Sequence, residues 1–306
     1  MSRRPSGVKA ASADMKRGTW LDVWRDATVA IGHLYRAGVK GPSGRIAKKK
    51  LFVVVGTGVV FGLQDDPTNT PWLVTAKHVF RDPAEKWDPA DLQIRFSWFD
   101  EKPVDEYFGI RIDLKKGGKR CWLSHPEEVV DLACLPLLIT KEQAGLGKVP
   151  RVTLGAFAKA GEIYEGAPVA VLGYPGAVGP SFWPRAIVRQ GIVSWVSPTK
   201  PESTVFLIDS NVFPGNSGGP VFQLPSGPDR HGGLAGGGAV PFLGIVSQAR
   251  IQKLPLTVGG KELEVQLKGR KRPETIFVPS FIGIGVIEPA FRVRQLLSAA
   301  AKARNP

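Results

Sequence analysis

The stretch that most constrains this chain is Pro214–Pro220, which reads Pro-Gly-Asn-Ser-Gly-Gly-Pro. Glycine adopts backbone conformations that are closed to other residues, so the glycines around Ser217 predict a tight loop with open space beside the serine hydroxyl. The amides of Gly215 and Ser217 can point at one spot and stabilise an oxyanion. Because Pro220-Val221-Phe222 reads as a strand, we expect a sharp loop that enters a β-sheet.

A serine is a weak nucleophile unless a base takes its proton, and the chain has 4 histidines to supply one. Three of them lie in a strand-like run or in turn-like loops, and these are His33, His125 and His231. His78 differs, because it follows the apolar, β-rich run that begins at Trp72. This pattern places the imidazole of His78 at a strand end, which is a rigid support for a base.

The best candidate for an orienting acid is Asp131, which lies within the apolar run Val129–Leu137. A carboxylate in such surroundings is costly unless it is hydrogen-bonded, and a histidine N–H is a suitable partner. Asp100, Asp105 and Asp113 lie among charged neighbours and read as solvated. The purely structural alternative for Asp131 is a turn or capping aspartate at the start of a strand.

The order His78, Asp131, Ser217 resembles that of the trypsin-like (chymotrypsin-fold) serine peptidases. The family's three motifs are matched by Thr75-Ala76-Lys77-His78, Asp131-Leu132-Ala133 and Gly215–Pro220. The resemblance implies that Ser217 is the nucleophile, that His78 is its general base, and that Asp131 orients His78. It also implies that the amides of Gly215 and Ser217 form the oxyanion hole.

Within this family the chain is similar to the bacterial high-temperature-requirement and glutamyl-endopeptidase branches. Asn216 precedes the serine where the zymogen-activated branch has an aspartate, so we expect no activation by N-terminal cleavage. Val79 follows the histidine, so the cysteine pair common around it is missing. We also expect no PDZ domain, because no peptide-binding module follows the peptidase segment.

The resemblance implies an all-β fold of two packed six-stranded antiparallel β-barrels with a short C-terminal helix. Short β-rich runs separated by glycine and proline agree with barrels. We expect a disordered basic N-terminus over 1–18 and a peptidase domain over 19–290. Within that domain the first barrel covers about 27–138 and the second about 152–287, and a helix and tail follow over 288–306.

Three other functions compete with this interpretation. Gly215–Gly219 also fits the Gly-x-Ser-x-Gly elbow of α/β-hydrolases, but that elbow needs a following helix and a downstream acid and histidine. The only downstream histidine is His231, in a loop rich in glycine and proline. A non-catalytic binding module on the trypsin-like fold would act through its basic surface, and an esterase-type hydrolase would use the same site chemistry.

The resemblance places the pocket for the side chain before the scissile bond at five positions: Asn211, Val212, Val246, Ser247 and Ala249. No charged residue stands among them, whereas selectivity for arginine or lysine needs an aspartate at the base. We therefore expect a broad preference for small to medium aliphatic residues, since an uncharged pocket discriminates such side chains weakly.

Composition limits the partners and the compartment. The net charge of +14 is partly clustered in Arg45–Lys50 and Lys268–Arg272, which predicts at most weak polyanion binding beside the protein or peptide substrate. Cys121 and Cys134 are too few for a disulfide scaffold, and residues 1–16 lack a signal peptide's apolar core, so we expect a cytoplasmic protein. We expect no membrane span, because no long apolar run exists, and no metal or cofactor, because no ligand motif is visible.

Overall fold

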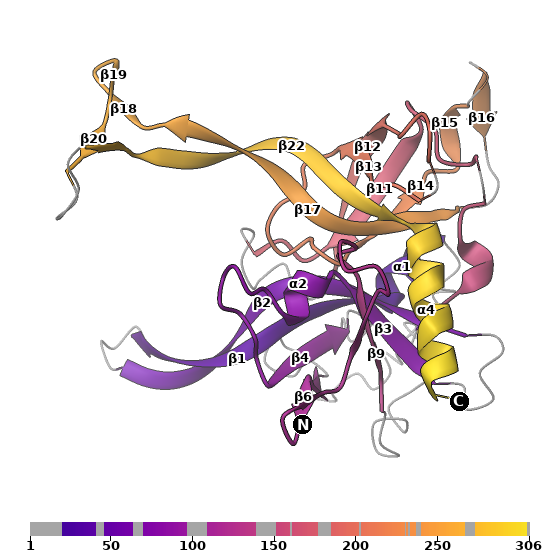
Figure 1. The fold of residues 1–306 in the computed structure, drawn as a ribbon, viewed down its shortest axis with the longest axis horizontal. Coiled ribbons are helices and arrows are strands. Elements are labelled where there is room, and N and C mark those ends of the chain that lie inside the picture. Colours follow the sequence, from indigo (N-terminus) through magenta and orange to yellow (C-terminus); the bar gives the residue numbers. More distant parts are fainter. Residues whose placement is uncertain are drawn as a thin grey trace, which may run out of the picture.

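Strands dominate the fold, and a helix lies at each end of it (Figure 1). These helices are α1 (Trp20–Ala27) and α4 (Ala290–Arg304), so the predicted mostly-β fold with a short C-terminal helix is confirmed. The predicted disordered segment 1–18 lies outside the residues that the structure describes, and so do residues 141–150 between the two predicted barrels. This computed structural model describes residues 20–40, 46–63, 70–96, 109–138, 151–159, 161–176, 185–201, 203–229, 231, 233–236, 240–266 and 273–304.

The C-terminal half forms a closed barrel of six antiparallel strands, as predicted. Inward-facing β-branched side chains such as those of Val169, Val171 and Ile208 fill it and are fully buried. Ala170 and Leu172, which alternate with these valines, are fully buried as well, in the cluster shared with the N-terminal half, so β11 is covered on both faces. In spatial order the strands are β11 (Pro168–Gly173), β12 (Ile187–Trp195), β13 (Phe206–Asp209), β22 (Phe277–Pro289), β17 (Phe242–Pro255) and β14 (Pro220–Gln223).

The N-terminal half differs from the predicted closed six-stranded barrel. It is an 8-stranded sheet, and among the described residues no strand pair closes it into a barrel. Seven strands follow one path: β5 (Gly109–Asp113), β4 (Asp91–Phe96), β1 (Thr28–Lys40), β2 (Ile46–Gly62), β3 (Pro71–Thr75), β9 (Ala133–Pro136) and β8 (Leu123–Ser124). The remaining strand, β10 (Val152–Thr153), pairs with β2 in parallel.

The pairing of β10 also corrects the predicted start of the second barrel near residue 152. Val152 lies opposite Phe61 of β2, so this segment belongs to the N-terminal sheet. The first strand of the closed barrel is β11, which begins at Pro168. A short 3-10 helix, η2 (Leu154–Ala156), follows β10 on the way to it.

One aromatic cluster joins the two halves. The ring of Trp24 on α1 stacks on Phe222 at 5.5 Å and on Phe242 at 5.4 Å, both from the closed barrel. Phe61 of β2 packs edge-on against Phe242 at 5.4 Å and against Phe157 at 5.3 Å. Because residues from both halves share this buried cluster, their relative position is fixed by packing.

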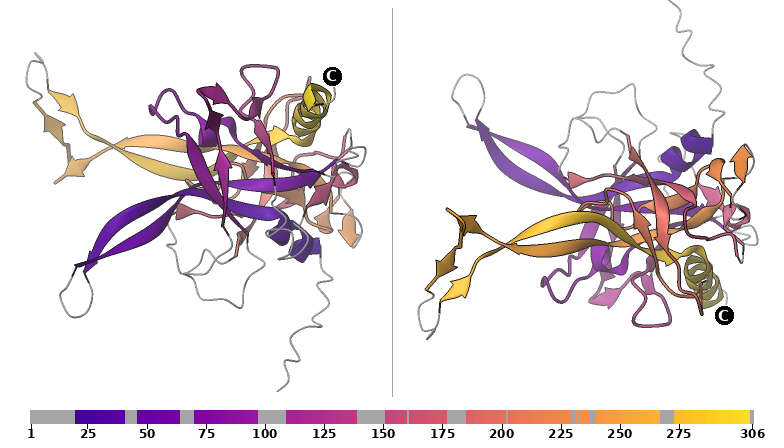
Figure 2. Two further views of the ribbon diagram at one scale, coloured as in Figure 1. Left: turned by 90° about the horizontal axis from the view of Figure 1, so that it is seen from below. Right: turned by 90° about the horizontal axis from the view of Figure 1, so that it is seen from above.

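Two strand pairs continue beyond the body of the protein as long ribbons. β1 with β2 and β17 with β22 both project from the same side of the molecule (Figure 1; Figure 2). At the tip of the second ribbon, β18 (Thr257–Val258) and β19 (Lys261–Glu262) form a hairpin around Gly259 and Gly260, whose φ angles are +60° and +79°. The other short strand pairs are β20 (Glu264–Val265) with β21 (Glu274–Thr275), β6 (Lys115–Lys116) with β7 (Lys119–Arg120), and β15 (Ser226–Pro228) with β16 (Leu234–Gly236).

Both cysteines are free thiols. Burial raises the pKa of Cys134 to about 12, so this thiol is protonated and inert at neutral pH. Among the described residues, no helix is both long enough and apolar enough to cross a membrane.

Trp24 provides a test of the packing between the halves. Trp24→Ala should lower the free energy of unfolding by about 3–5 kcal/mol, because it removes a buried ring that stacks on two others. Val23→Ala on the same helix is the control, since Val23 is 53% exposed and its loss should change stability by less than about 0.5 kcal/mol. Guanidinium unfolding measures both, and equal effects of the two substitutions would contradict the packing role.

Candidate active site

His78 lies directly after β3, in the one-turn helix α2 (Lys77–Phe80). The predicted position at a strand end is therefore refined to the first turn that follows the strand. Val79 and Phe80 are buried and hold this turn against the N-terminal sheet. The Thr75 hydroxyl donates to the Thr57 carbonyl at 2.6 Å and fixes the end of β3 against β2.

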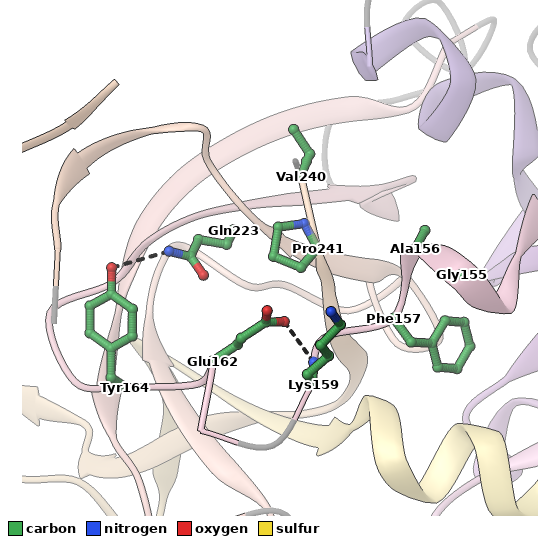
Figure 3. Close-up of a pocket in the computed structure, with 9 residues that line it drawn as sticks. All are labelled: Gly155, Ala156, Phe157, Lys159, Glu162, Tyr164, Gln223, Val240 and Pro241. Carbon is green, nitrogen blue, oxygen red and sulfur yellow. Dashed lines mark hydrogen bonds between the residues drawn. The ribbon is translucent and has the colours of Figure 1, made fainter. Parts of the chain in front are cut away.

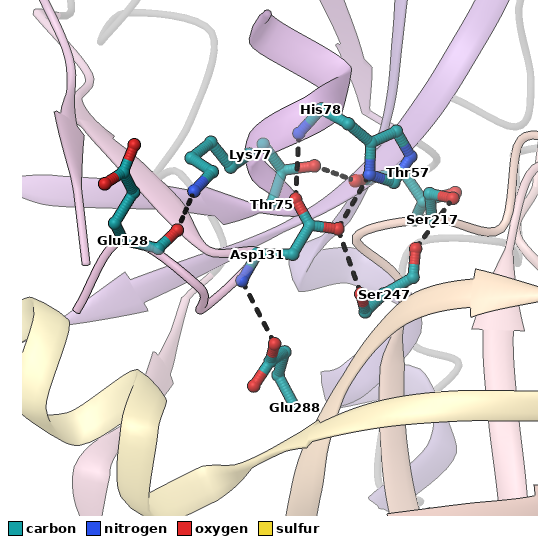
Figure 4. A network of polar contacts seen from close by, with 9 residues as sticks. All are labelled: Thr57, Thr75, Lys77, His78, Glu128, Asp131, Ser217, Ser247 and Glu288. Carbon is teal, nitrogen blue, oxygen red and sulfur yellow. Dashed lines mark hydrogen bonds and ion pairs between the residues drawn. The ribbon is translucent and has the colours of Figure 1, made fainter. Parts of the chain in front are cut away.

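Asp131 lies just before β9, and its carboxylate is bonded on both oxygens (Figure 4). The backbone N–H of His78 donates to Oδ1 at 3.0 Å, and Nδ1 of His78 lies 2.7 Å from Oδ2. The hydroxyl of Ser247, on β17, donates to the same Oδ2 at 2.9 Å. The carboxylate is only 15% exposed, so these bonds stabilise a charge that burial alone would disfavour.

A second carboxylate supports Asp131 from behind. The backbone N–H of Asp131 donates to Oε1 of Glu288 at 3.0 Å, and Arg292 of α4 donates to Oε2 of Glu288 at 2.7 Å. The Glu288 side chain is 3% exposed. Through this pair, the last strand of the closed barrel and the C-terminal helix both help to position Asp131.

Ser217 lies in a loop whose shape only glycine permits at two positions. Gly215 and Gly218 have φ angles of +96° and +88°. A Cβ atom on Gly218 would lie 1.9 Å from the Thr57 carbonyl oxygen. The loop is anchored to β17 by the bond from the Gly218 N–H to the Val246 carbonyl at 2.7 Å.

Thr57 of β2 holds the same loop from the opposite side. Its backbone N–H donates to the Ser217 carbonyl at 2.8 Å, and its hydroxyl donates to the Gly215 carbonyl at 2.6 Å. The N–H of Tyr174 donates back to this hydroxyl at 3.0 Å. Thr57 therefore fixes the direction of two carbonyls of the loop, those of Gly215 and Ser217.

Within the described part of the chain, neither the Gly215 N–H nor the Ser217 N–H donates a hydrogen bond to a protein acceptor. Buried backbone N–H groups are nearly always hydrogen-bonded. Two such groups without an acceptor beside a serine are typical of a site that binds an anionic oxygen. This is the arrangement that the sequence predicted for an oxyanion hole, and the assignment stays a prediction.

The Ser217 hydroxyl donates to the Ser247 carbonyl at 3.3 Å (Figure 4). Within the described residues it makes no hydrogen bond to His78. Contacts between nucleophile and base are often loose without substrate and tighten when substrate binds.

The environment of His78 raises its pKa above the ordinary value of 6.5. Burial by itself lowers this pKa, but the hydrogen bond that the ring donates to Asp131 and the negative charge of Asp131 outweigh burial, and Asp82 adds to the rise. The imidazole therefore holds a proton more tightly than a free histidine does, which suits a base that must accept one during the reaction.

The five predicted pocket residues do not all face solvent. Val212 and Val246 are fully buried in the closed barrel, and Ser247 is turned toward Asp131. Asn211 is exposed, and Ala249 is half-buried on β17. Two of the five are therefore open to solvent, and the pocket assignment stays a prediction.

Neighbouring residues that sequence reasoning missed complete this region. Phe213 packs edge-on against Phe281 at 5.6 Å, and the Arg189 guanidinium lies 4.8 Å from the Phe213 ring. The positioning roles of Thr57 and Glu288 were also missed. Glu288 carried a usable signal, because it follows the apolar run Ile284–Ile287 as an isolated carboxylate, much as Asp131 does in its own run.

A further cavity is lined by residues other than those of this site. It has a volume of about 550 Å³ and is lined in part by Gln223, the last residue of β14 (Figure 3). Two hydrogen bonds cross its lining: the Lys159 N–H donates to Glu162 at 2.6 Å, and Gln223 donates to the Tyr164 hydroxyl at 3.1 Å. None of the residues predicted to be catalytic lines it.

Three features together define a peptidase of the chymotrypsin type: the closed barrel, the strand-rich N-terminal half and the serine loop. A family model described as a trypsin-like peptidase domain matches residues 56–227, which is more than half of the chain. The chain therefore belongs to this family, and it is a serine peptidase, a hydrolase that acts on proteins or peptides.

Comparison with solved structures finds more distant likenesses. Two crystal structures of Rv3671c in an inactive form, one of them a serine-to-alanine mutant from M. tuberculosis H37Rv, are each 18% identical to this chain. The mutant has a TM-score of 0.44 and the match covers 94% of this chain and 91% of that one; the other has a TM-score of 0.43 and covers 91% of each. No curated protein gives a significant match. We draw no argument from likenesses at this level.

Ser247 offers a test of the geometry around Asp131. Ser247→Ala removes one donor from the carboxylate, so the carboxylate becomes more basic and the pKa of His78 rises further. We expect kcat to fall by about 10- to 100-fold with little change in KM, and the acidic limb of the pH–kcat profile to move to higher pH. Ser197→Ala, a buried serine away from the site, is the control. A loss of activity without movement of the limb would point to a purely structural role for Ser247.

Proposed function

We propose that this serine peptidase is an endopeptidase that cleaves peptide bonds through a triad of His78, Asp131 and Ser217, by way of an acyl-enzyme. The observation that carries the proposal is the pair of contacts from one histidine to one buried carboxylate, 3.0 Å from the His78 amide and 2.7 Å from Nδ1. Together they hold the ring so that Nδ1 faces Asp131 and Nε2 is left for Ser217.

The steps follow from this orientation. Nε2 of His78 takes the Ser217 proton while Oγ attacks the scissile carbonyl carbon, and the amides of Gly215 and Ser217 stabilise the oxygen that becomes negative. The carbon–nitrogen bond then breaks, and His78 gives the proton to the leaving amine. Water, activated by the same imidazole, hydrolyses the acyl-enzyme, while Asp131 stabilises the charged form of His78 at each stage.

The two other functions that keep this fold are less well supported. A non-catalytic binding module would be favoured by a missing triad residue, and His78, Asp131 and Ser217 are all present. Polyanion binding stays a prediction: Lys48 is exposed on β2, whereas 268–272 lie outside the described residues. An esterase would use the same chemistry, and a comparison of matched amide and ester substrates separates the two activities.

Finer assignments within the proposal also stay predictions. The similarity to the high-temperature-requirement and glutamyl-endopeptidase branches rests on the motifs around His78 and Ser217. The aliphatic preference before the scissile bond rests on the absence of a charged residue at the five predicted pocket positions. A peptide-library digest measures that preference directly.

Removal of the nucleophile or the base is the direct test of the triad. Ser217→Ala or His78→Ala should lower kcat by roughly four to six orders of magnitude without changing the fold, because these residues act as a unit. A fluorophosphonate should label the native protein at Ser217 and leave Ser217→Ala unlabelled. Near-normal peptidase activity in a folded Ser217→Ala variant would show that the nucleophile is elsewhere.

The raised pKa of His78 fixes the sign of the pH dependence. The base works only when it is neutral, so activity is lost as the pH falls through a pKa that lies above 6.5. We expect kcat/KM to rise with pH and to reach its half-maximum above 6.5, on the basis of this shift. A flat profile from pH 5 to 8, or a half-maximum near pH 4, would exclude His78 as the base.

A further inference from the structure

The ribbon of β1 and β2 leaves the body of the protein with both of its faces uncovered (Figure 1). β4 pairs with β1 only from Val29 to Gly32, and β3 pairs with β2 only from Val59 onward. Among the described strands, residues 33–40 therefore have only residues 46–53 beside them, and we call these two segments the β1/β2 ribbon. A two-stranded ribbon is marginally stable in water by itself, so a surface that covers one of its faces would stabilise it.

One face of the β1/β2 ribbon is apolar. Residues directly opposite each other on paired strands share a face, and successive residues alternate between faces. Tyr35 lies opposite Leu51, and His33 lies opposite Val53, two positions further along the same face. Tyr35, Leu51 and Val53 are 56%, 40% and 38% exposed. The register adds three apolar positions and one lysine toward the tip, and these are Ala37, Val39, Ala47 and Lys49.

The opposite face of the ribbon is cationic. The register places four cations on it, and these are Arg36, Lys40, Lys48 and Lys50. Arg36 and Lys48 are exposed. The sequence contains no acidic residue between Asp26 and Asp65, so the ribbon itself supplies no counter-charge. A partner that neutralises these cations must therefore bring its own negative charge.

The combination of the two faces decides between partners. An element with lysine and arginine on one face and exposed apolar side chains on the other is typical of binding in the plane of an anionic membrane interface. A two-stranded ribbon also fits the major groove of duplex DNA, but phosphates would neutralise the cations and leave the apolar face in water. A second copy of the chain would cover the apolar face, but it would bring together two proteins that each carry a net charge of +14.

We propose that the β1/β2 ribbon binds the surface of an anionic phospholipid bilayer. Its apolar face lies at the boundary between headgroups and acyl chains, and its cationic face lies among the headgroup phosphates. The proposal does not depend on the peptidase mechanism, because none of the residues predicted to be catalytic lies on the ribbon. Bound in this way, the enzyme would be a peripheral protein that meets its substrates at a membrane surface.

Vesicle sedimentation with the full-length native protein tests the proposal. One set of vesicles is phosphatidylcholine alone, and the other contains about one third phosphatidylglycerol. We expect binding to the anionic vesicles to be stronger by about tenfold or more, because each lysine or arginine near an anionic surface strengthens binding by about fivefold. Raising the salt from about 0.1 M to about 0.5 M should remove most of this difference, because salt screens the attraction.

Two pairs of substitutions test the two faces of the ribbon separately. Arg36→Gln/Lys48→Gln should weaken binding to anionic vesicles by about 30-fold at low salt. Tyr35→Ser/Leu51→Ser should weaken it by about tenfold at both salt concentrations, because it removes apolar surface that the bilayer would cover. The cation variant removes no apolar contact, so it tests the proposal even where the apolar variant does not fold. Circular dichroism and thermal unfolding report the folding of both.

Matched controls lie outside the ribbon. Lys116→Gln/Lys119→Gln, on β6 and β7, lowers the net charge by the same amount at two exposed positions. Leu138→Ser/Leu234→Ser removes apolar side chains that are 77% and 87% exposed. Both controls should bind anionic vesicles nearly as the native protein does.

Several outcomes would overturn the proposal. These are equal binding to neutral and anionic vesicles, no loss of binding in either ribbon variant, and an equal loss in the matched control. Tighter binding to duplex DNA than to anionic vesicles, unchanged by the apolar substitutions, would assign the ribbon to nucleic acid instead. A dimer in analytical ultracentrifugation that the apolar substitutions dissociate, together with no binding to vesicles, would assign it to a second copy of the chain.

Discussion

The site depends on how the chain satisfies the Asp131 carboxylate. An ionised carboxylate in an apolar run is costly unless hydrogen bonds replace its water. Its donors come from both halves of the protein: His78 from the turn after β3 and Ser247 from β17 of the closed barrel. The carboxylate is therefore fully bonded only when the two halves are docked. The hydrogen bonds to Asp131 therefore set the geometry of the proposed base and also join the two halves of the fold.

A parallel set of bonds ties the serine loop to the two halves. Thr57 of the N-terminal sheet holds the carbonyls of Gly215 and Ser217, and Val246 of the closed barrel bonds to Gly218. Glycine is needed because a side chain at Gly218 would collide with the Thr57 carbonyl. The proposed oxyanion-binding amides, nucleophile and base are thus positioned from opposite sides of one interface. Their supports are backbone and short side chains, which lose little entropy when they are fixed.

Local sequence patterns predicted much of the candidate site, whereas the rest of the site and of the fold depends on contacts between segments that are distant in the sequence. The glycines around Ser217, the apolar run before His78 and the isolated Asp131 each left a local trace, so their juxtaposition could be predicted once the family resemblance was seen. The parallel pairing of Val152 with Phe61 left none, which is why this segment was expected to start the second barrel, and the closed first barrel was an expectation from the family resemblance alone. The bond from Ser247 to Asp131 spans 116 residues of sequence, and no periodicity reports such a contact. The long ribbon of β17 and β22 could not be predicted either, because nothing in the sequence indicates that the pairing of these strands continues past the barrel.

The central claim is that Asp131 holds His78 with its proton on Nδ1 and leaves Nε2 free toward Ser217. Nitrogen-15 NMR of the imidazole measures this directly, and with 4 histidines in the chain the resonances can be assigned by substitution. Above the pKa of His78, the account predicts a protonated Nδ1 and an unprotonated Nε2, and Asp131→Asn should disturb that preference. A neutral His78 with its proton on Nε2 in the native protein would contradict the account, because the ring could not then accept the Ser217 proton.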